Sequence, residues 1–437
     1  MLGLAGLGTV VSTELHQSQS LPQIKFQKMS SVLKQSVFTL LNRRLCNVYA
    51  RAFATAQQQT YSRSVLQQQK HFLNGHPENA LASDRFLTMR DYAMNSGAQN
   101  YGSHLLSQMI AKCAPEISSI CKKECMTKSL NAVEFGCATG TSSLLPIDAI
   151  RKAVGPTTDV NIIMNDLPLN DWGELSKTIS TNCPPQVSFD ISSQSMYDDI
   201  VAPTQSVDLA YSCFAQHWLS GGVPCHLPAE TGAIWGNQMS SVPGGTDIQR
   251  IWAESSRKDW ERFLELRANE VRIGGIVVLL IQSAFLDGTL NEGFAHVCQV
   301  AKKQCLEEGI FTKDEAERMC MPEYMKTAFE ILQPLQRNPH RTKWEVLQMD
   351  HRIAPCVVTD ENVFSSNANK SATEKASEIV EFLKSFMSSS LENSLNAERS
   401  SIKLQQFWDK VFQIILKDPA KSDTSWAITM LALKRKK

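Results

Sequence analysis

The sequence predicts an α/β fold built on a doubly wound, mostly parallel sheet. One observation is that short apolar runs alternate with helical patterns from residue 131 onward, as parallel strands joined by crossover helices do. A second is that the first apolar run, in "NAVEFGCATGTSS" (131–143), breaks into a loop of small residues that holds Gly136 and Gly140. Ligands of such sheets bind beyond the carboxyl ends of the strands, so this loop is where we expect a ligand.

Each element follows from its own pattern. The run "GGIVVLLIQ" (274–282) is apolar almost throughout, which is typical of a strand buried on both faces. The other predicted strands are 131–135, 160–165, 206–213, 344–349 and 425–433, and the main predicted helices are 142–154, 171–179, 246–272 and 292–309. Inserts at about 223–272 and 290–330 are helical. Because they adjoin the strand ends, we expect them to form a helical cap.

Composition narrows the function classes. The 437 residues carry a formal net charge of zero, which gives no electrostatic reason to expect a nucleic-acid partner. No apolar stretch is long enough for a transmembrane helix. The twelve cysteines are scattered, as is usual in a reducing compartment, and they predict no metal site. Cys121 and Cys125, four residues apart, leave a zinc or redox pair as an alternative to ordinary thiols.

Residues 1–77 differ from the rest of the chain. Between Glu14 and Glu78 there is no acidic residue, while lysine, arginine, serine and glutamine are frequent. This composition, with a basic amphipathic pattern in "SVLKQSVFTLLNRRLCNVYARAF", is typical of a mitochondrial transit peptide. A disordered extension on a cytoplasmic protein is the alternative. The folded domain is expected to span residues 84–437.

Two acidic residues at strand ends indicate which nucleotide the loop binds. Asp166 ends the second predicted strand, where a carboxylate accepts hydrogen bonds from ribose hydroxyls of NAD or of S-adenosylmethionine. Glu134 lies beside the glycine turn. Its charge is a poor neighbour for a pyrophosphate but suits a ligand with an ammonium and a sulfonium group. The pair therefore favours S-adenosylmethionine over NAD.

Five segments in order resemble a known family, the SABATH carboxyl methyltransferases, which methylate salicylate, jasmonate and related acids. The segments are "DYAMNSGAQ" (91–99), "EFGCATGTSS" (134–143), "MNDLPLNDWGELSKTI" (164–179), "YSCFAQHWLSGGVP" (211–224) and "FLELRANEVRIGGIVVLL" (263–280). The resemblance covers about four-fifths of the chain. It implies a seven-stranded Rossmann-like methyltransferase sheet, with the last strand antiparallel and a helical cap above it.

The resemblance also implies the site residues. Those expected to contact S-adenosylmethionine are Tyr92, Glu134, Gly136, Cys137, Ser142, Asp166, Leu167, Ser195 and Met196. Those expected on the methyl-acceptor side are Gln99, Phe214, His217 and Trp218, with Phe294 and Trp235 as further walls. Ser142 stands where the family usually has Asn, and Phe214 where Tyr is common. The segment "AERMCMPEYM" lacks the acid and the Asn of the magnesium site found in some members, so we expect no metal there.

The implied reaction is O-methylation of a small-molecule carboxylic acid to its methyl ester. A carboxylic acid is already ionised at neutral pH, so no catalytic base is expected. The Gln99 amide and the Trp218 indole would hold the carboxylate in line with the methyl group. N-methylation of a heteroaromatic compound and a non-catalytic cofactor-binding protein are the alternatives. The expected partner is the small-molecule acid, and a homodimer is left open.

Overall fold

The computed structural model describes residues 97–123, 129–221, 226–241, 245–290, 292–355, 370–418 and 425–437. These residues belong to one compact unit, Glu78–Lys437. The predicted extension 1–77, Tyr92 and Cys125 lie outside the described residues, so the transit peptide stays a prediction. Within the described residues, no helix is both long and apolar enough to cross a membrane.

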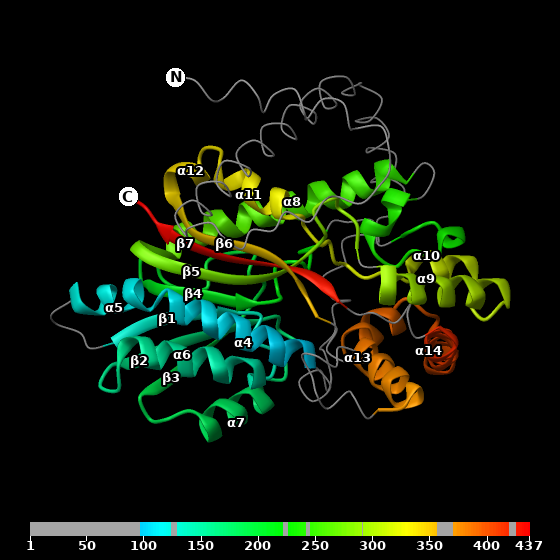
Figure 1. Cartoon of the computed structure of the whole chain (residues 1–437), viewed down its shortest axis with the longest axis horizontal. Coiled ribbons are helices and arrows are strands. Elements are labelled where there is room, and N and C mark those ends of the chain that lie inside the picture. Colours follow the sequence, from blue (N-terminus) through cyan, green and yellow to red (C-terminus); the bar gives the residue numbers. More distant parts are fainter. Residues whose placement is uncertain are drawn as a thin grey trace, which may run out of the picture. The chain divides into compact units, whose positions relative to one another are not determined.

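A seven-stranded sheet with the order β3-β2-β1-β4-β5-β7-β6 forms the centre of this unit (Figure 1). The strands are β1 (Ser129–Phe135), β2 (Asp159–Asp166), β3 (Val187–Ser193), β4 (Val207–Cys213), β5 (Val271–Ser283), β6 (Trp344–Ala354) and β7 (Trp426–Arg435). Strands β1 to β5 pair in parallel, and β7 runs antiparallel to β5 and β6. The predicted methyltransferase sheet is confirmed.

Strand β3 has no counterpart among the strands located from the sequence. Its apolar residues Val187, Phe189 and Ile191 alternate with polar ones, and it lies at the edge of the sheet with most side chains at least partly exposed. A search for continuous apolar runs overlooks this strand, because a half-exposed edge strand shows period-two alternation instead.

Strand β5 shows how both faces of the sheet are covered. Its side chains at 276, 278 and 280 pack with one layer of helices, and those at 277, 279 and 281 pack with the other. The first layer contains α4 (Gly97–Lys112), α5 (Ala114–Lys123), α6 (Leu144–Val154) and α7 (Trp172–Asn182), and the second contains α8 (Thr246–Glu270) and α11 (Ala328–Leu335). Each such side chain stabilises the fold by roughly 1.5–3 kcal/mol.

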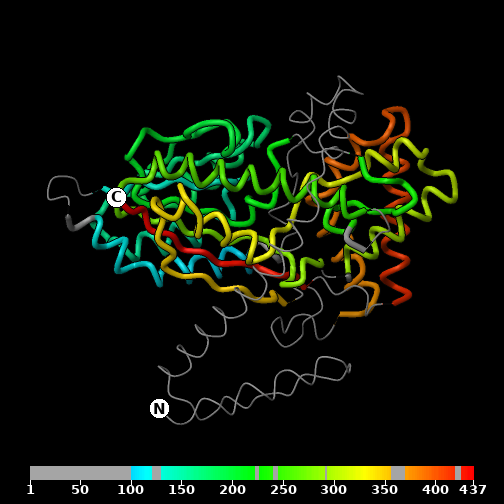
Figure 2. The backbone as a smooth tube through the Cα atoms, turned by 90° about the horizontal axis from the view of Figure 1, so that it is seen from above, coloured from blue at the N-terminus to red at the C-terminus, as the bar shows by residue number. Residues whose placement is uncertain are grey.

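A group of helices lies beyond the carboxyl ends of the parallel strands (Figure 1). It contains α9 (Glu292–Glu307), α10 (Lys313–Arg318), α13 (Ala372–Glu392) and α14 (Ser400–Lys417). Figure 2, seen from above, also shows these helices to one side of the sheet. The later part of α8 is different, because Trp260, Phe263 and Leu264 pack in the core on one face of the sheet. The cap boundaries drawn from the sequence stay a prediction.

Candidate functional site

The carboxyl ends of β1, β2, β3 and β4 bring most of the predicted site residues to one edge of the sheet. On the cofactor side, Glu134 lies near the end of β1 and Asp166 ends β2, while Gly136 and Cys137 follow β1 and Leu167 follows β2. Ser195 and Met196 follow β3, and Phe214, His217 and Trp218 follow β4. Since these strands are neighbours in the parallel sheet, their carboxyl ends meet at the same edge.

The loop after β1 has a fixed conformation. Gly136 and Gly140 have φ values of 75° and 82°, in the left-handed region that glycine adopts without strain. The amides of Gly136 and Cys137 both donate to the carbonyl oxygen of Asn165, at 2.8 and 3.2 Å. A Cβ on Gly136 would lie 2.6 Å from the Cβ of Ala215. Glycine is therefore needed there both for the turn and for the approach of the β4 loop.

Asp166 links the loops after β1 and β2. Its carboxylate accepts hydrogen bonds from the amides of Ala138 at 2.7 Å and Leu167 at 2.8 Å, one on each oxygen. Burial raises the pKa of this carboxyl, and the two amide bonds oppose that rise. Each oxygen keeps a second lone pair, so two hydroxyl groups of a ligand can still donate to it. Leu167, beside it, is 38% exposed and offers an apolar surface.

Glu134 is buried rather than open to the loop. Its carboxylate accepts hydrogen bonds from the Ser143 hydroxyl at 2.9 Å and the Tyr211 hydroxyl at 3.0 Å. Burial raises its pKa to about 7, although both hydroxyls favour the ionised form. Asp166 adds a further rise by repulsion between like charges. Sequence reasoning missed Ser143 and Tyr211, although both lie inside the segments that carry the family resemblance.

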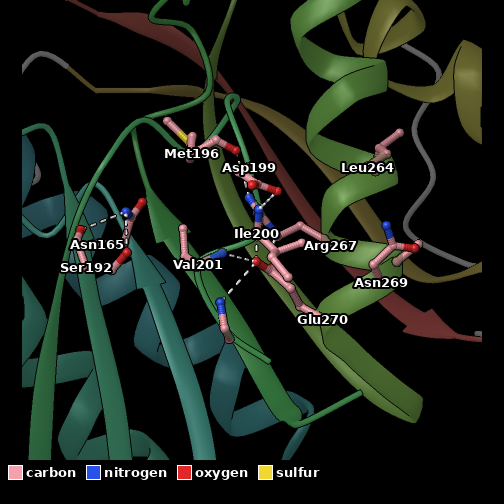
Figure 3. Close-up of polar contacts among 12 residues, drawn as sticks. Asn165, Ser192, Met196, Asp199, Ile200, Val201, Leu264, Arg267, Asn269 and Glu270 are labelled. Carbon is pink, nitrogen blue, oxygen red and sulfur yellow. Dashed lines mark hydrogen bonds and ion pairs between the residues drawn. The ribbon is translucent and has the colours of Figure 1, made fainter. Parts of the chain in front are cut away.

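The loop after β3 connects the cofactor side with the acceptor side. Ser195 accepts a hydrogen bond from the amide of Tyr197 on its hydroxyl, at 3.2 Å. The Tyr197 hydroxyl donates to the carbonyl of Trp218 at 3.0 Å, and the Gln216 amide lies 3.9 Å from the Met196 sulfur. The backbone carbonyl oxygen of Met196 also accepts a hydrogen bond from Arg267, a buried residue of α8 (Figure 3). Movement of this loop would therefore affect both halves of the site.

Phe214 begins the loop after β4 in a strained conformation. Its φ of 56° lies in the left-handed region, which is unusual for a bulky residue. The ring packs edge-on against Trp426 at 6.4 Å between centroids. A Cβ on Gly102, in α4, would lie 2.3 Å from the ring. The Phe214 ring thus packs between α4 and the start of β7.

His217 belongs to a buried polar group with Glu323 and Trp235. Its Nε2 lies 3.6 Å from a carboxylate oxygen of Glu323, and the other oxygen accepts the Trp235 indole N–H at 2.8 Å. No hydrogen bond reaches the Nδ1 of His217 from any residue that the structure describes. Glu323 lies in the segment for which the sequence predicts no magnesium site, and no local pattern predicts its contact with His217. Among the described residues, no cluster of three or more His, Cys, Asp or Glu side chains could hold a metal ion.

A small apolar cavity lies between the end of β5, the start of β7 and helix α9. Its lining residues are Gln282, Ser283, Phe285, Leu290, Phe294, Met325, Trp426 and Ala427. Phe294 is one of the lining residues, and the fully buried Trp235 packs edge-on against it at 5.5 Å between ring centroids. Trp426 is also a ring neighbour of Phe214. The cavity is therefore close to the predicted acceptor side.

The remaining predicted residues are placed only in part. Gln99 lies in the first turn of α4, and its side chain falls outside the described part of the chain. Ser142 lies in a single 3-10 turn, Thr141–Ser143, where its carbonyl accepts the Ser103 hydroxyl at 2.6 Å. The Ser142 side chain is half-buried. Neither placement tests the roles that the resemblance implies for these two residues.

Comparison with known proteins gives the family. The family model described as "SAM dependent carboxyl methyltransferase" matches residues 88–436. The chain belongs to this family. The SABATH resemblance and the S-adenosylmethionine cofactor inferred from the sequence are thereby confirmed.

Relatives within the methyltransferases are distant. "Probable caffeine synthase 2" of Camellia sinensis is 23% identical over 49% of this chain and 63% of its own length. "Gibberellic acid methyltransferase 2" of Arabidopsis thaliana is 22% identical over 48% of this chain and 59% of its own. The chain thus spans less than two-thirds of the length of these relatives. A solved structure, "Loganic acid methyltransferase with SAH", shares the fold with a TM-score of 0.62 at 17% identity, covering 79% of this chain and 96% of that one.

The charges at the edge of the sheet fit the positively charged cofactor of this methyltransferase family. Glu134 and Asp166 are two acids close enough to raise the pKa of Glu134. In the part of the chain that the structure describes, no lysine or arginine forms an ion pair with either one. An ammonium and a sulfonium group would supply the missing positive charge. We therefore assign Asp166 to the ribose side and Glu134 to the cationic side as proposals.

The buried Glu134 predicts how stability depends on pH. Because its pKa rises from 4.5 to about 7 on folding, the folded chain binds a proton that the unfolded chain has lost in that interval. The resulting stabilisation is fully present below about pH 4.5 and is lost as the pH rises through about 7. Between about pH 4.5 and pH 8, ligand-free wild type should lose roughly 3 kcal/mol more stability than Glu134→Gln. Urea unfolding at both pH values measures this, and equal pH dependence in the two proteins would contradict it.

The contact between Gly102 and Phe214 predicts a packing effect. Gly102→Ala places a methyl group 2.3 Å from the Phe214 ring, which should destabilise the protein by about 1–3 kcal/mol and change the KM for the acceptor. Gly173→Ala in α7 is the control, since the nearest atom to its new Cβ would be 3.5 Å away. Urea unfolding should show no loss for that control. Equal losses in the two variants would mean that the ring contact is not the cause.

Proposed function

We propose that this methyltransferase transfers a methyl group from S-adenosylmethionine to the carboxylate of a small-molecule acid, forming a methyl ester. The observation that carries the proposal is the position of Trp218. Trp218 lies after β4, which is the neighbour of β1 in the sheet. Its backbone carbonyl accepts a hydrogen bond from the hydroxyl of Tyr197, in the loop after β3, at 3.0 Å. This position supports a role for the Trp218 indole N–H as a hydrogen-bond donor to the acid, next to the methyl group of the cofactor. The apolar cavity beside Phe294 and Trp426 supports an acceptor with an apolar body.

The proposed reaction needs positioning rather than a base. The methyl carbon loses its bond to sulfur and gains one to a carboxylate oxygen, and no proton moves. The carboxylate is already ionised at neutral pH. Trp218 and Gln99 would orient it, and the buried surroundings of Phe214 would keep water away. Holding the two reacting atoms roughly 3 Å apart would then supply most of the acceleration.

N-methylation of a heteroaromatic ring is the second candidate, and His217 favours it. A ring N–H must lose its proton during methylation, so a base is useful. His217 is 4% exposed and its Nδ1 has no hydrogen-bond partner among the described residues. Glu323, 3.6 Å from Nε2, could hold the ring. The similarity to a caffeine synthase agrees with this candidate.

The stability of the transferred label to alkali separates the candidates. Wild-type protein is incubated with methyl-labelled S-adenosylmethionine and a panel of monocarboxylic acids or a metabolite extract. We expect label that alkali releases as methanol, as a methyl ester requires. Alkali-stable label would favour N-methylation. Cofactor binding without any transfer would favour a non-catalytic protein and contradict the proposal.

A further inference from the structure

A buried ion pair at the end of α8 lies against the loop after β3. Arg267 and Glu270 both have fully buried side chains. The guanidinium binds the carboxylate in a bidentate manner, with Nε to Oε2 at 2.5 Å and Nη2 to Oε1 at 3.1 Å. Both residues belong to the "FLELRANEV" segment (263–271), and the family resemblance assigns neither of them a role.

The pair binds the backbone of this loop at both of its ends. Arg267 Nη1 donates to the carbonyl oxygen of Met196 at 3.0 Å. Glu270 Oε1 accepts the amides of Val201 and Ala202, the latter at 3.3 Å. Figure 3 shows the two side chains extending from α8 toward Val201 and Met196. The segment 196–202 is thus held at its first and last residues by one buried pair.

Arg267 also contacts the end of β1. Its guanidinium lies over the ring of Phe135, 4.2 Å from the centroid, and 4.9 Å from that of Phe263. Phe135 is the last residue of β1 and directly precedes Gly136 of the glycine loop. The same side chain therefore contacts the loop that carries Ser195 and Met196 and the residue that precedes the glycine loop.

Stability alone does not account for this arrangement. Removing two charges from water opposes folding, and apolar residues of similar volume often replace such pairs without loss. An apolar pair would attach α8 to the sheet but could not bind the carbonyl of Met196 or the amides of Val201 and Ala202. What the ion pair adds is the fixed position of the loop.

We propose that Arg267 and Glu270 are positioning residues that hold the 194–202 loop in the arrangement that binds S-adenosylmethionine. The proposal rests on the proposed S-adenosylmethionine-dependent function and on the cofactor contacts that the family resemblance predicts for Ser195 and Met196. It does not depend on which acceptor is methylated. Neither residue touches the reacting atoms, so the expected effect is on cofactor affinity.

Arg267→Lys in the full chain tests the proposal. A lysine can still pair with Glu270, but its single ammonium cannot also reproduce the planar fork that reaches Met196. Calorimetry with S-adenosylhomocysteine should show a dissociation constant raised about tenfold, as loss of a charge-assisted hydrogen bond would give. The KM for S-adenosylmethionine should rise in parallel, whereas kcat should change less than about twofold.

Arg257→Lys is the matched control. Arg257 lies on the same helix, on a half-exposed surface, and pairs with Glu254 at 2.6 Å and Glu261 at 2.7 Å. Its cofactor affinity should equal that of wild type. If Arg267→Lys does not fold, the double variant Arg267→Met, Glu270→Gln removes both charges together and should show the same weakened binding.

The outcomes separate this proposal from the proposed function. Wild-type affinity in Arg267→Lys, or equal weakening in Arg257→Lys, would overturn the positioning role. Wild type that binds S-adenosylhomocysteine but esterifies no acid would overturn the carboxyl methylation alone. In that case the comparison of affinities would still decide the role of the ion pair.

Discussion

Asp166→Ala is expected to weaken S-adenosylmethionine binding about 100-fold. The variant would lose the two hydrogen bonds that ribose hydroxyls are proposed to donate to this carboxylate, each contributing roughly 1.5 kcal/mol or more. It also removes the acceptors that hold the amides of Ala138 and Leu167 at 2.7 and 2.8 Å. Calorimetry with S-adenosylhomocysteine measures the change directly.

The control for this prediction lies on the same strand. Asp159 is exposed at the opposite end of β2, so Asp159→Ala should bind the cofactor as wild type does. Circular dichroism would verify that both variants are folded. An Asp166→Ala protein with wild-type affinity would show that the ribose lies elsewhere.

Trp218→Phe is expected to reduce turnover about 10- to 100-fold with little change in cofactor affinity. The substitution keeps an aromatic ring but removes the N–H that would hold the carboxylate, one charge-assisted hydrogen bond. The carbonyl of Trp218 that binds Tyr197 is unaffected. Gln99→Ala should act in the same direction. Initial rates with an accepted acid, together with calorimetry of cofactor binding, separate the two effects.

Trp172→Phe provides the matched control for this loss. The Trp172 indole donates to the carbonyl of Pro168 at 3.3 Å on α7, apart from the predicted acceptor side. Its turnover should equal that of wild type. If Trp218→Phe keeps full turnover, the acid is not bound by that indole.

Most of the sheet could be predicted from the sequence, because its strands are locally distinct. The continuous apolar run of β5 is buried on both faces and is recognisable without any partner. Edge strand β3 was missed because its side chains are half-exposed. The insert at about 223–272, which includes α8, was expected in a cap because it adjoins the strand ends. Only packing shows that Trp260 and Phe263 face the sheet.

The candidate site divides in the same way. By itself the sequence determined the glycine loop, since the φ values of Gly136 and Gly140 are local requirements of the backbone, and it placed Asp166 at a strand end. Only the tertiary structure decided that Glu134 is buried against Tyr211, 77 residues away, and that Arg267 holds Met196, 71 residues away. Such contacts depend on strand order and on helix packing across the sheet. No local sequence pattern predicts these contacts, because the two partners of each lie far apart in the chain.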